Sequence, residues 1–352
     1  MTGYPGFLGE ALLPRLLRAD PDVVAHCLVQ GRFRAEAERA RRALEPAAAA
    51  RVHLVEGDIT RPGLGLTPDS VPEELSAVWH LAALYDLDAS AERCHPVNVT
   101  GTAHVLGWLA TLPGAPRLHY VSTCYVSGTH TGVFREEELE LGQGFKNAYE
   151  ASKHAAEVLV RRAMDHGLAA TVYRPAIVVG DSTTGATRKY DGPYHVIRML
   201  LRQPRLAVVP VPGGMAAATV NVVPRDFVVT AMVALAARAD SAGRTYHLAH
   251  PAPPSAAEML GMLARATGRV AVPVRVPGRL ARGLLRRSAL LRRLLLPPGL
   301  LDYFTHPVRH DTTHAARDLA DSGIAPPDFA AYVDRLVAYV RAHPEVGAEA
   351  MV

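Results

Sequence analysis

A tyrosine and a lysine four residues apart, Tyr149 and Lys153, are the side chains whose types and spacing most directly indicate chemistry. Residues four apart on a helix share a face, so the phenol and the ammonium would be neighbours. An ammonium beside a phenol stabilises the phenolate and lowers the pKa of the tyrosine from about 10. The pair is therefore expected to pass a proton near neutral pH. The alternative is a surface helix that carries an incidental pair.

The scarcity of lysine strengthens this interpretation. Only Lys146, Lys153 and Lys189 are lysines among the 38 basic residues, and the rest are arginines. Codon bias in a GC-rich genome would explain the scarcity. Whatever its cause, a lysine at helical spacing from a tyrosine is a rare event in this chain.

Two hydroxyl residues, Ser122 and Thr123, stand at the end of an apolar run that is typical of a buried strand. Open α/β sheets bind their ligands at the carboxyl ends of parallel strands. A hydroxyl there could hydrogen-bond a substrate carbonyl and the oxyanion that develops from it. From its position, either hydroxyl could take this role. The alternative is a residue that only caps the strand.

A glycine-rich turn opens the chain, where Gly3, Gly6 and Gly9 precede a helical pattern. Glycines let the backbone approach a pyrophosphate, whose charge then lies at a helix N-terminus. The turn therefore predicts a dinucleotide site, and its alternative is an ordinary turn before a helix. Such a turn should follow a strand, yet only Met1 and Thr2 precede it. The first, central strand is therefore expected to be missing, because the start codon was assigned too late, because the sequence is truncated or because the fold tolerates the loss. The first explanation is favoured, so the native chain is expected to begin upstream of Met1.

The segment that ends the second expected strand bears on the choice of cofactor. An acidic side chain there binds the ribose hydroxyls of NAD, whereas nearby arginines bind the additional phosphate of NADP. Residues 27–34 contain no acid and include Arg32 and Arg34, which suit bidentate phosphate contact. NADP(H) is therefore favoured over NAD(H), with two solvated arginines as the alternative. Asp58, after the next strand, is expected beside the adenine or as a simple turn residue.

Short β-branched runs alternate with helical patterns in the first half of the chain. Strands are expected at 23–29, 52–56, 77–81, 117–122, 170–179, 219–223 and 245–248, and helices at 6–17, 35–44, 98–109, 149–166 and 226–237. This order predicts an α/β fold with a doubly wound parallel sheet. A nucleotide-binding domain is expected at 1–180 plus 219–250. A smaller, mainly helical substrate-binding lobe is expected at 181–218 plus 251–352.

Composition and charge exclude several classes of function. The net charge is +4 and the pI about 9.0, without a concentrated basic tract, so no nucleic-acid partner is expected. Three cysteines are too few for a disulfide framework and form no C-x-x-C pair, which favours the cytoplasm and argues against structural zinc. Neither a secretory signal nor an apolar run of membrane-spanning length is expected.

Together these motifs resemble the extended short-chain dehydrogenases/reductases, the NAD(P)-dependent epimerase/dehydratase superfamily. The matching pieces stand in family order over about residues 1–250: T-G-x-x-G-F-L-G at 2–9, G-D-I at 57–59, H-L-A-A at 80–83, N-V-T-G-T at 98–102, S-T-C-Y-V at 122–126, Y-x-x-x-K at 149–153 and Y-R-P at 173–175. The resemblance implies a Rossmann fold and an NAD(P)-dependent oxidoreductase. It implies that Thr123 polarises the substrate carbonyl and that Tyr149 donates or accepts the proton. Lys153 would bind the nicotinamide ribose and tune Tyr149.

The same resemblance implies which residues contact the cofactor. They are Gly3, Gly6, Phe7, Leu8, Gly9, Arg32, Arg34, Asp58, Ile59, Leu81, Ala82, Ala83, Asn98, Tyr149, Lys153, Pro175, Ile177 and Val178. No metal is expected: His306, His310 and His314 have helical spacing, but Pro307 interrupts that helix.

Three stretches, 27–29 with the basic helix after it, 180–185 and 191–194, are similar to the thioester reductase and fatty acyl-CoA reductase branch. This similarity implies hydride transfer to or from the carbonyl of a lipophilic acyl thioester, aldehyde or ketone. Two alternatives stay open, a nucleotide-sugar epimerase or dehydratase with tightly bound cofactor and a non-catalytic nucleotide-sensing protein. The intact set of threonine, tyrosine and lysine weighs against the second.

A basic amphipathic pattern, Arg279 to Leu296, lies in the expected substrate lobe. It would suit a lid over a lipophilic substrate, a peripheral membrane contact or the phosphate of an acyl carrier. Its alternative is a helix that docks its leucines on the lobe and leaves its arginines in solvent. The sequence also leaves a homodimer open.

Overall fold

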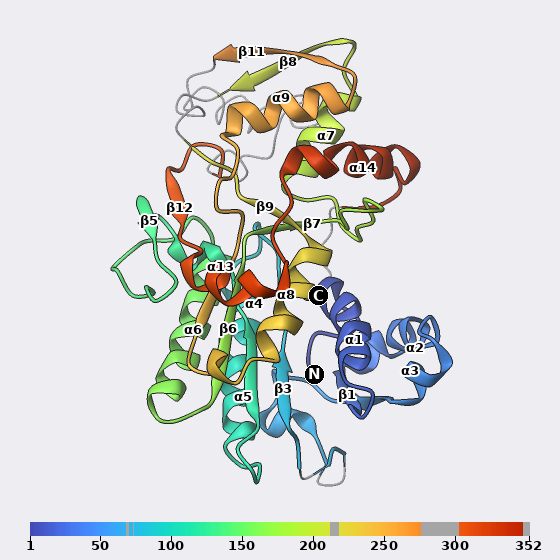
Figure 1. The fold of residues 1–352 in the computed structure, drawn as a ribbon, viewed down its shortest axis with the longest axis vertical. Helices are drawn as coiled ribbons and strands as arrows, with labels where there is room; N and C mark the ends of the chain where they lie inside the picture. Colours follow the sequence, from blue (N-terminus) through green and yellow to red (C-terminus); the bar gives the residue numbers. More distant parts are fainter. Residues whose placement is uncertain (68–69, 73, 212–217, 276–302, 348–352) are drawn as a thin grey trace.

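Parallel strands form the centre of the computed structural model, which describes residues 1–67, 70–72, 74–211, 218–275 and 303–347 (Figure 1). The largest sheet has the strand order β10-β6-β4-β3, and its neighbouring strands are all parallel. Its strands are β3 (Ala77–His80), β4 (Arg117–Val121), β6 (Ala170–Pro175) and β10 (Thr245–Leu248). Every residue of β6 and β10 is buried, as expected for strands that are covered on both faces.

The first two residues of the chain connect this sheet to a second parallel pair, β1 (Ala25–Val29) and β2 (Val52–Glu56). The Leu28 amide donates to the Met1 carbonyl at 2.8 Å, and the Thr2 amide donates to the Trp79 carbonyl at 2.8 Å. Thr2 also forms a parallel bridge with the last residue of β3. Met1 and Thr2 therefore lie between β1 and β3, in the place expected for the first strand of the sheet.

Helices cover both faces of the four-stranded sheet. On one face lie α1 (Phe7–Ala19), α8 (Arg225–Ala236) and α13 (Thr313–Leu319), on the other α4 (Ala91–His95), α5 (Gly101–Leu109) and α6 (Ala148–Asp165), and beside β1 and β2 lie α2 (Arg34–Arg42) and α3 (Pro46–Ala50). The neighbours Val172 and Tyr173 of β6 belong to two different hydrophobic cores, one on each face. The doubly wound parallel sheet predicted from the sequence is confirmed.

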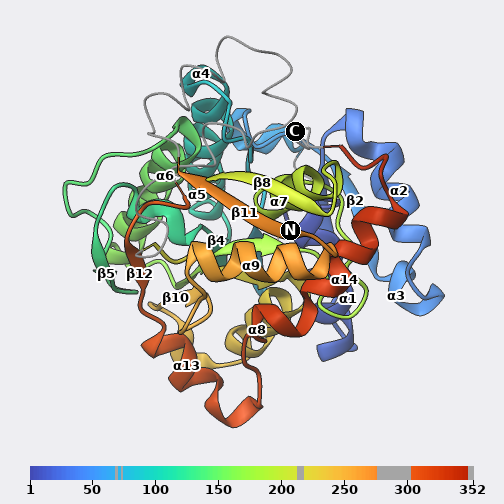
Figure 2. The same ribbon diagram turned by 90° about the horizontal axis from the view of Figure 1, so that it is seen from above.

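The other elements lie mostly above the sheet in Figure 1. They are β7 (Ile177–Val179), α7 (Pro193–Leu201), β8 (Leu206–Val211), β9 (Val222–Pro224), α9 (Ala256–Ala266), β11 (Val270–Arg275) and α14 (Phe329–Ala342), with β5 (Gly132–Phe134) and β12 (Val308–His310) at the side. Helices α7, α9 and α14 share one hydrophobic core. Figure 2 shows α9 and the parallel pair β8–β11 over the centre of the molecule. The division into two domains stays a prediction.

Two expected elements are divided differently in the structure. The strand expected at 170–179 is interrupted at Ala176, whose amide donates to Leu248 of β10, whereas the next amide donates to Asn221. The chain therefore leaves the main sheet there and pairs β7 with β9. The helix expected at 98–109 begins as a wide π-helical turn over Pro96–Thr100 and becomes α5 only at Gly101.

The basic pattern at 279–296 lies outside the described residues, so its role stays a prediction. Among the helices that the structure does describe, none has both the length and the apolar character needed to cross a membrane.

Candidate active site

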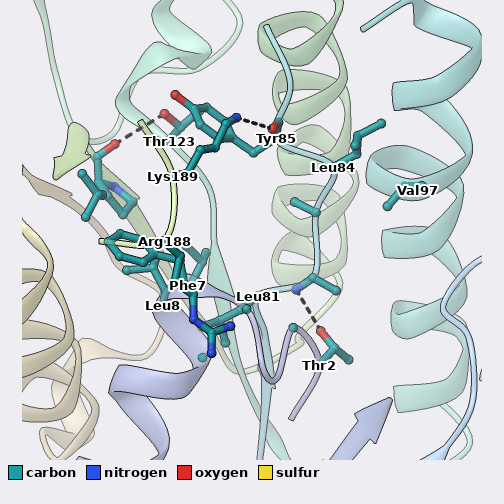
Figure 3. A pocket seen from close by; sticks show the side chains of 18 of the residues that line it. Thr2, Phe7, Leu8, Leu81, Leu84, Tyr85, Val97, Thr123, Arg188 and Lys189 are labelled. Atoms are coloured by element: carbon teal, nitrogen blue, oxygen red, sulfur yellow. Dashed lines mark hydrogen bonds between the residues drawn. The ribbon is translucent and has the colours of Figure 1, made fainter. Parts of the chain in front are cut away.

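A cavity of about 620 Å³ lies at the carboxyl ends of the parallel strands (Figure 3). It is lined by most of the site residues predicted from the sequence: Gly3, Gly6, Phe7, Leu8, Gly9, Arg32, Ile59, Leu81, Ala82, Ala83, Thr123, Tyr149, Lys153, Pro175, Ile177 and Val178. Ser122 also lines it. The structure therefore brings the glycine turn and the Thr123–Tyr149–Lys153 set into one space.

Three predicted cofactor residues do not line this cavity. Arg34 donates to the Leu54 carbonyl at 3.1 Å, and Asp58 accepts hydrogen bonds from the amide and hydroxyl of Thr60 at 2.8 Å each. Asn98 is buried, accepts from the Leu84 amide at 2.8 Å and donates to the Leu84 carbonyl at 3.1 Å. Asn98 thus fixes the backbone of a segment that lines the cavity. Direct cofactor contacts of these three residues stay predictions.

Two positions of the glycine turn, Gly3 and Gly9, leave no room for a side chain. Gly3 has a φ of +82°, and a Cβ there would lie 2.7 Å from the backbone of Leu81 and Ala82. A Cβ at Gly9 would collide with the Gly3 carbonyl oxygen. The turn therefore brings the N-terminus of α1 close to the strand end, and the first residues of this helix line the cavity. This cradle fits a pyrophosphate, which such a helix end attracts.

We expect Gly9→Ala to weaken dinucleotide binding by about tenfold or more, equivalent to about 1.4 kcal/mol. The added methyl group would displace the Gly3 carbonyl and widen the turn. Gly107→Ala in α5 is the matched control, because nothing lies within 4 Å of the position of its Cβ. Calorimetric titration with NADPH and NADH measures both variants. Equal affinities for Gly9→Ala and wild type would contradict the predicted pyrophosphate site.

Tyr149 lies in the first turn of α6, which Asn147 caps by accepting a hydrogen bond from the Glu150 amide at 2.9 Å. Burial raises the pKa of Tyr149 above its ordinary value, with further increases from the Glu150, Cys94 and Asp191 side chains. Hydrogen bonding with Thr123 opposes the rise in the Tyr149 pKa. The sequence suggested the opposite direction, because it could not show how deeply the phenol is buried. A protonated phenol is suited to donate its proton.

Lys153 lies on the same face of α6, and its ammonium contacts β4. The Nζ atom donates to the Val121 carbonyl at 2.8 Å and to the Tyr120 hydroxyl at 3.0 Å. Burial lowers the pKa of Lys153 to about 7, and the Glu157 carboxylate acts against this decrease. The ammonium is therefore held at the strand end, and its predicted contact with a ribose stays a prediction.

The Lys153 shift predicts a pH-dependent contribution to stability. An unfolded lysine has a pKa near 10.5, so between pH 7 and 10.5 the unfolded chain binds more protons than the folded chain. The contribution of Lys153 to the free energy of unfolding should therefore rise with pH in this window. We expect the stability of Lys153→Met relative to wild type, measured by urea unfolding, to decrease from pH 7 to pH 10. A pH-independent difference would contradict the shifted pKa; other titrating groups are common to both proteins and cancel.

Thr123 is placed between the strand end and the tyrosine. Its hydroxyl donates to the Pro175 carbonyl at 3.4 Å and accepts from the Tyr125 amide at 3.3 Å. Figure 3 shows Thr123 near the end of the cavity that also holds Tyr85 and Lys189. Ser122 and Thr123 both line the cavity, so the choice of Thr123 as the carbonyl-binding hydroxyl stays a prediction.

Sequence reasoning missed several residues around Tyr149. The Tyr85 ring meets the Tyr149 ring edge to face with 5.0 Å between centroids, and Lys189 Nζ lies 4.6 Å from the centre of the Tyr85 ring. Tyr303 also lines the cavity, and Lys146 Nζ lies 5.3 Å from its ring centre. All three lysines of the chain therefore lie in the cavity or against a residue that lines it. Their scarcity was the one signal that could have identified Lys189.

The three histidines considered as metal ligands have separate roles. His306 contacts the His130 carbonyl at 2.6 Å, His310 contacts the Ser127 hydroxyl at 3.2 Å, and His314 lies at the start of α13. Among the described residues, no cluster of three or more histidine, cysteine or acidic side chains is arranged to hold a metal ion.

Comparisons with known proteins agree on the family and the kind of fold. Residues 1–232 match the family model described as Male sterility protein, an NAD-binding family. The terminal R domain of the myxalamid PKS-NRPS biosynthetic pathway has a similar crystal structure, with a TM-score of 0.82 and 29% identity over 98% of this chain and 91% of that chain.

Two curated proteins are similar over most of this chain. A linear gramicidin synthase of Brevibacillus parabrevis is 29% identical over 267 residues, which are 71% of this chain and 5% of that protein. The L-2-aminoadipate reductase large subunit of Eremothecium gossypii is 28% identical over 273 residues, which are 70% of this chain and 19% of that protein. The chain thus spans a small part of these relatives.

Proposed function

The chain belongs to the Male sterility protein family, a thioester-reductase-like branch of the extended short-chain dehydrogenases/reductases, and on this premise we propose that it is an NADP(H)-dependent reductase of lipophilic carbonyl compounds. As a member of this family it is an NAD(P)-dependent oxidoreductase. The observation that carries the finer proposal is the single cavity that joins the glycine cradle to Thr123, Tyr149 and Lys153.

The lining of the cavity around Tyr149 supports a lipophilic substrate. Its side chains there are largely apolar or aromatic: Leu84, Tyr85, Leu87, Val97, Tyr125 and Tyr303. Such surface gains free energy when it is covered by an acyl chain. The similar R domain comes from a PKS-NRPS pathway, which supports an acyl thioester, presented by a carrier or by coenzyme A, as the substrate class. Aldehydes and ketones are the related carbonyl substrates.

The chain's own residues would act in three steps. The Thr123 hydroxyl would hold the substrate carbonyl oxygen beside the Tyr149 phenol. When bound at the glycine cradle, NADPH would supply the hydride. As negative charge develops on the carbonyl oxygen, Tyr149, which burial keeps protonated, would donate its proton to it. Lys153 would orient the ribose from its place at the end of β4.

Arg32 supports NADP(H) as the preferred cofactor. It lines the cavity from the segment after β1, whereas Arg34 pairs with Glu38 at 3.5 Å and does not line it. The guanidinium of Arg32 lies 4.8 Å from the centre of the Phe33 ring, so its charge stays near the cavity. A guanidinium there would bind the 2′-phosphate by donating hydrogen bonds to its oxygens.

The test is NADPH consumption by the full chain with acyl-CoAs, long-chain aldehydes, ketones and sterols. We expect stoichiometric oxidation of NADPH with a lipophilic thioester or aldehyde, and a weaker rate with NADH. A nucleotide-sugar epimerase would instead retain its cofactor through purification and convert sugar nucleotides without net oxidation. Conversion of a sugar nucleotide together with no oxidation by any lipophilic carbonyl would overturn the proposal.

A further inference from the structure

The side chain of Arg188 contacts residues that lie more than 150 positions earlier in the sequence. Arg188 belongs to the segment 181–192 between β7 and α7, yet its guanidinium donates to the Pro5 carbonyl in the glycine turn at 2.8 Å. The same group pairs with Glu36 of α2 at 2.8 Å and with Glu10 of α1 at 2.7 Å. Figure 3 shows Arg188 near Phe7 and Leu8, whereas its neighbour Lys189 lies near Tyr85.

The segment that carries Arg188 is held in place by several contacts. The Ser182 amide donates to the Asp226 carboxylate at 2.7 Å, and Arg335 of α14 donates to the Thr183 carbonyl at 2.8 Å. A Cβ at Gly185 would collide with the Arg335 carbonyl, so the segment packs closely on α14. Arg188 therefore reaches the glycine turn from a fixed backbone.

The contact between Arg188 and Glu36 is important because Glu36 lines the cavity. Glu36 lines it together with Arg32 and Phe33, all from the segment after β1, and it pairs with Arg188, which Figure 3 shows apart from Thr123 and Tyr85. An acid at this end of a dinucleotide site accepts hydrogen bonds from the ribose hydroxyls of NAD, and it would repel the 2′-phosphate of NADP. Sequence reasoning found no acid at 27–34, but helix α2 supplies one two residues later. This site thus contains groups that favour either cofactor.

We propose that Arg188 is a specificity-determining residue for the cofactor, because its ion pair with Glu36 offsets the charge of this carboxylate at the adenosine end of the cavity. With Glu36 neutralised, Arg32 faces the 2′-phosphate without a competing anion. The inference rests on the proposed NADP(H)-dependent function. It makes cofactor choice depend on a residue from the segment between β7 and α7 as well as on the residues that follow β1.

The experiment measures the dissociation constants of NADPH and NADH by calorimetry for the full chain and four variants. We expect Arg188→Gln to move the preference at least about tenfold towards NADH, since it releases the Glu36 carboxylate. Glu36→Gln should not reduce the NADPH preference, and the double variant Arg188→Gln/Glu36→Gln should recover most of it. Glu10→Gln is the matched control, because Glu10 pairs with Arg188 but does not line the cavity, and its ratio should equal that of wild type.

Three outcomes would overturn the inference. In the first, Arg188→Gln weakens the binding of NADPH and NADH equally, which would mean that Arg188 only stabilises the glycine turn. In the second, Glu10→Gln shifts the ratio as much as Arg188→Gln does. In the third, the double variant keeps the NADH preference of Arg188→Gln. A wild-type protein that prefers NADH would contradict the proposed NADP(H) dependence. If the wild-type protein prefers NADPH but its ratio of NADPH to NADH dissociation constants is the same in Arg188→Gln, only this inference is contradicted.

Discussion

Replacing Tyr149 with phenylalanine is expected to lower kcat by about 10²–10⁴-fold, the range of a lost general acid. The variant keeps the ring that packs edge to face against Tyr85 and loses only the hydroxyl. Because burial holds the pKa of this hydroxyl above its ordinary value, we expect it to stay protonated between pH 6 and pH 8. The loss should therefore be nearly independent of pH between pH 6 and pH 8, measured as single-turnover NADPH oxidation.

Tyr85→Phe is the control for this experiment, since it removes another hydroxyl from the same cavity. We expect Tyr85→Phe to change kcat far less than Tyr149→Phe. The NADPH dissociation constant of Tyr149→Phe should stay within about threefold of wild type, a difference below 1 kcal/mol. Full activity of Tyr149→Phe, or equal losses in the two variants, would rule out the assigned proton donor.

Neutralising Glu157 with glutamine is expected to destabilise the protein by about 3–5 kcal/mol, because it leaves a buried arginine without its counter-ion. Arg174 of β6 is fully buried and its Nη2 donates to Glu157 of α6 at 2.6 Å. The Nε atom of Arg174 also donates to Glu157, and its Nη1 and Nη2 atoms meet the carbonyls of Glu136 and Glu138 and the ring of His247. The pair joins β6, an inner strand of the main sheet, to the helix that carries Tyr149, so activity should fall together with stability.

Urea unfolding measures the effect of Glu157→Gln. Glu38→Gln is the matched control, because Glu38 also pairs with arginine, at 3.1 Å from Arg41, but its side chain is partly exposed. Such a pair contributes about 0–1 kcal/mol. A change below about 1 kcal/mol for Glu157→Gln would show that the buried Arg174 is satisfied by its carbonyl partners alone.

The sequence predicted the central sheet well because parallel strands that are buried on both sides read as short apolar runs between helices. The expected strand at 245–248 has the bounds of β10, and the expected helix at 149–166 differs from α6 by one residue at each end. The pairs β8–β11 and β5–β12 were missed, because each joins segments far apart in the chain. Local pattern carries no information about such partners.

The candidate site was predictable where its residues follow strand ends or share a helix. Thr123 and Lys153 are of this kind, and both line the cavity. Arg188 and Tyr303 were not predictable, because only the folding of distant segments brings them to the same cavity. The direction of the Tyr149 pKa was missed for a related reason, since burial is a property of the whole fold.

The placement of the three lysines makes the cavity accessible to spectroscopy. Reductive methylation with ¹³C-formaldehyde modifies amines, and here it would give at most three lysine side-chain signals. Lys153 and Lys189 line the cavity, and Lys146 packs over Tyr303. The resonance of any modified lysine would therefore report ligand binding without assignment of a crowded spectrum. By the same reasoning, attaching the protein to a sensor surface through its lysine amines would obstruct the cavity under study.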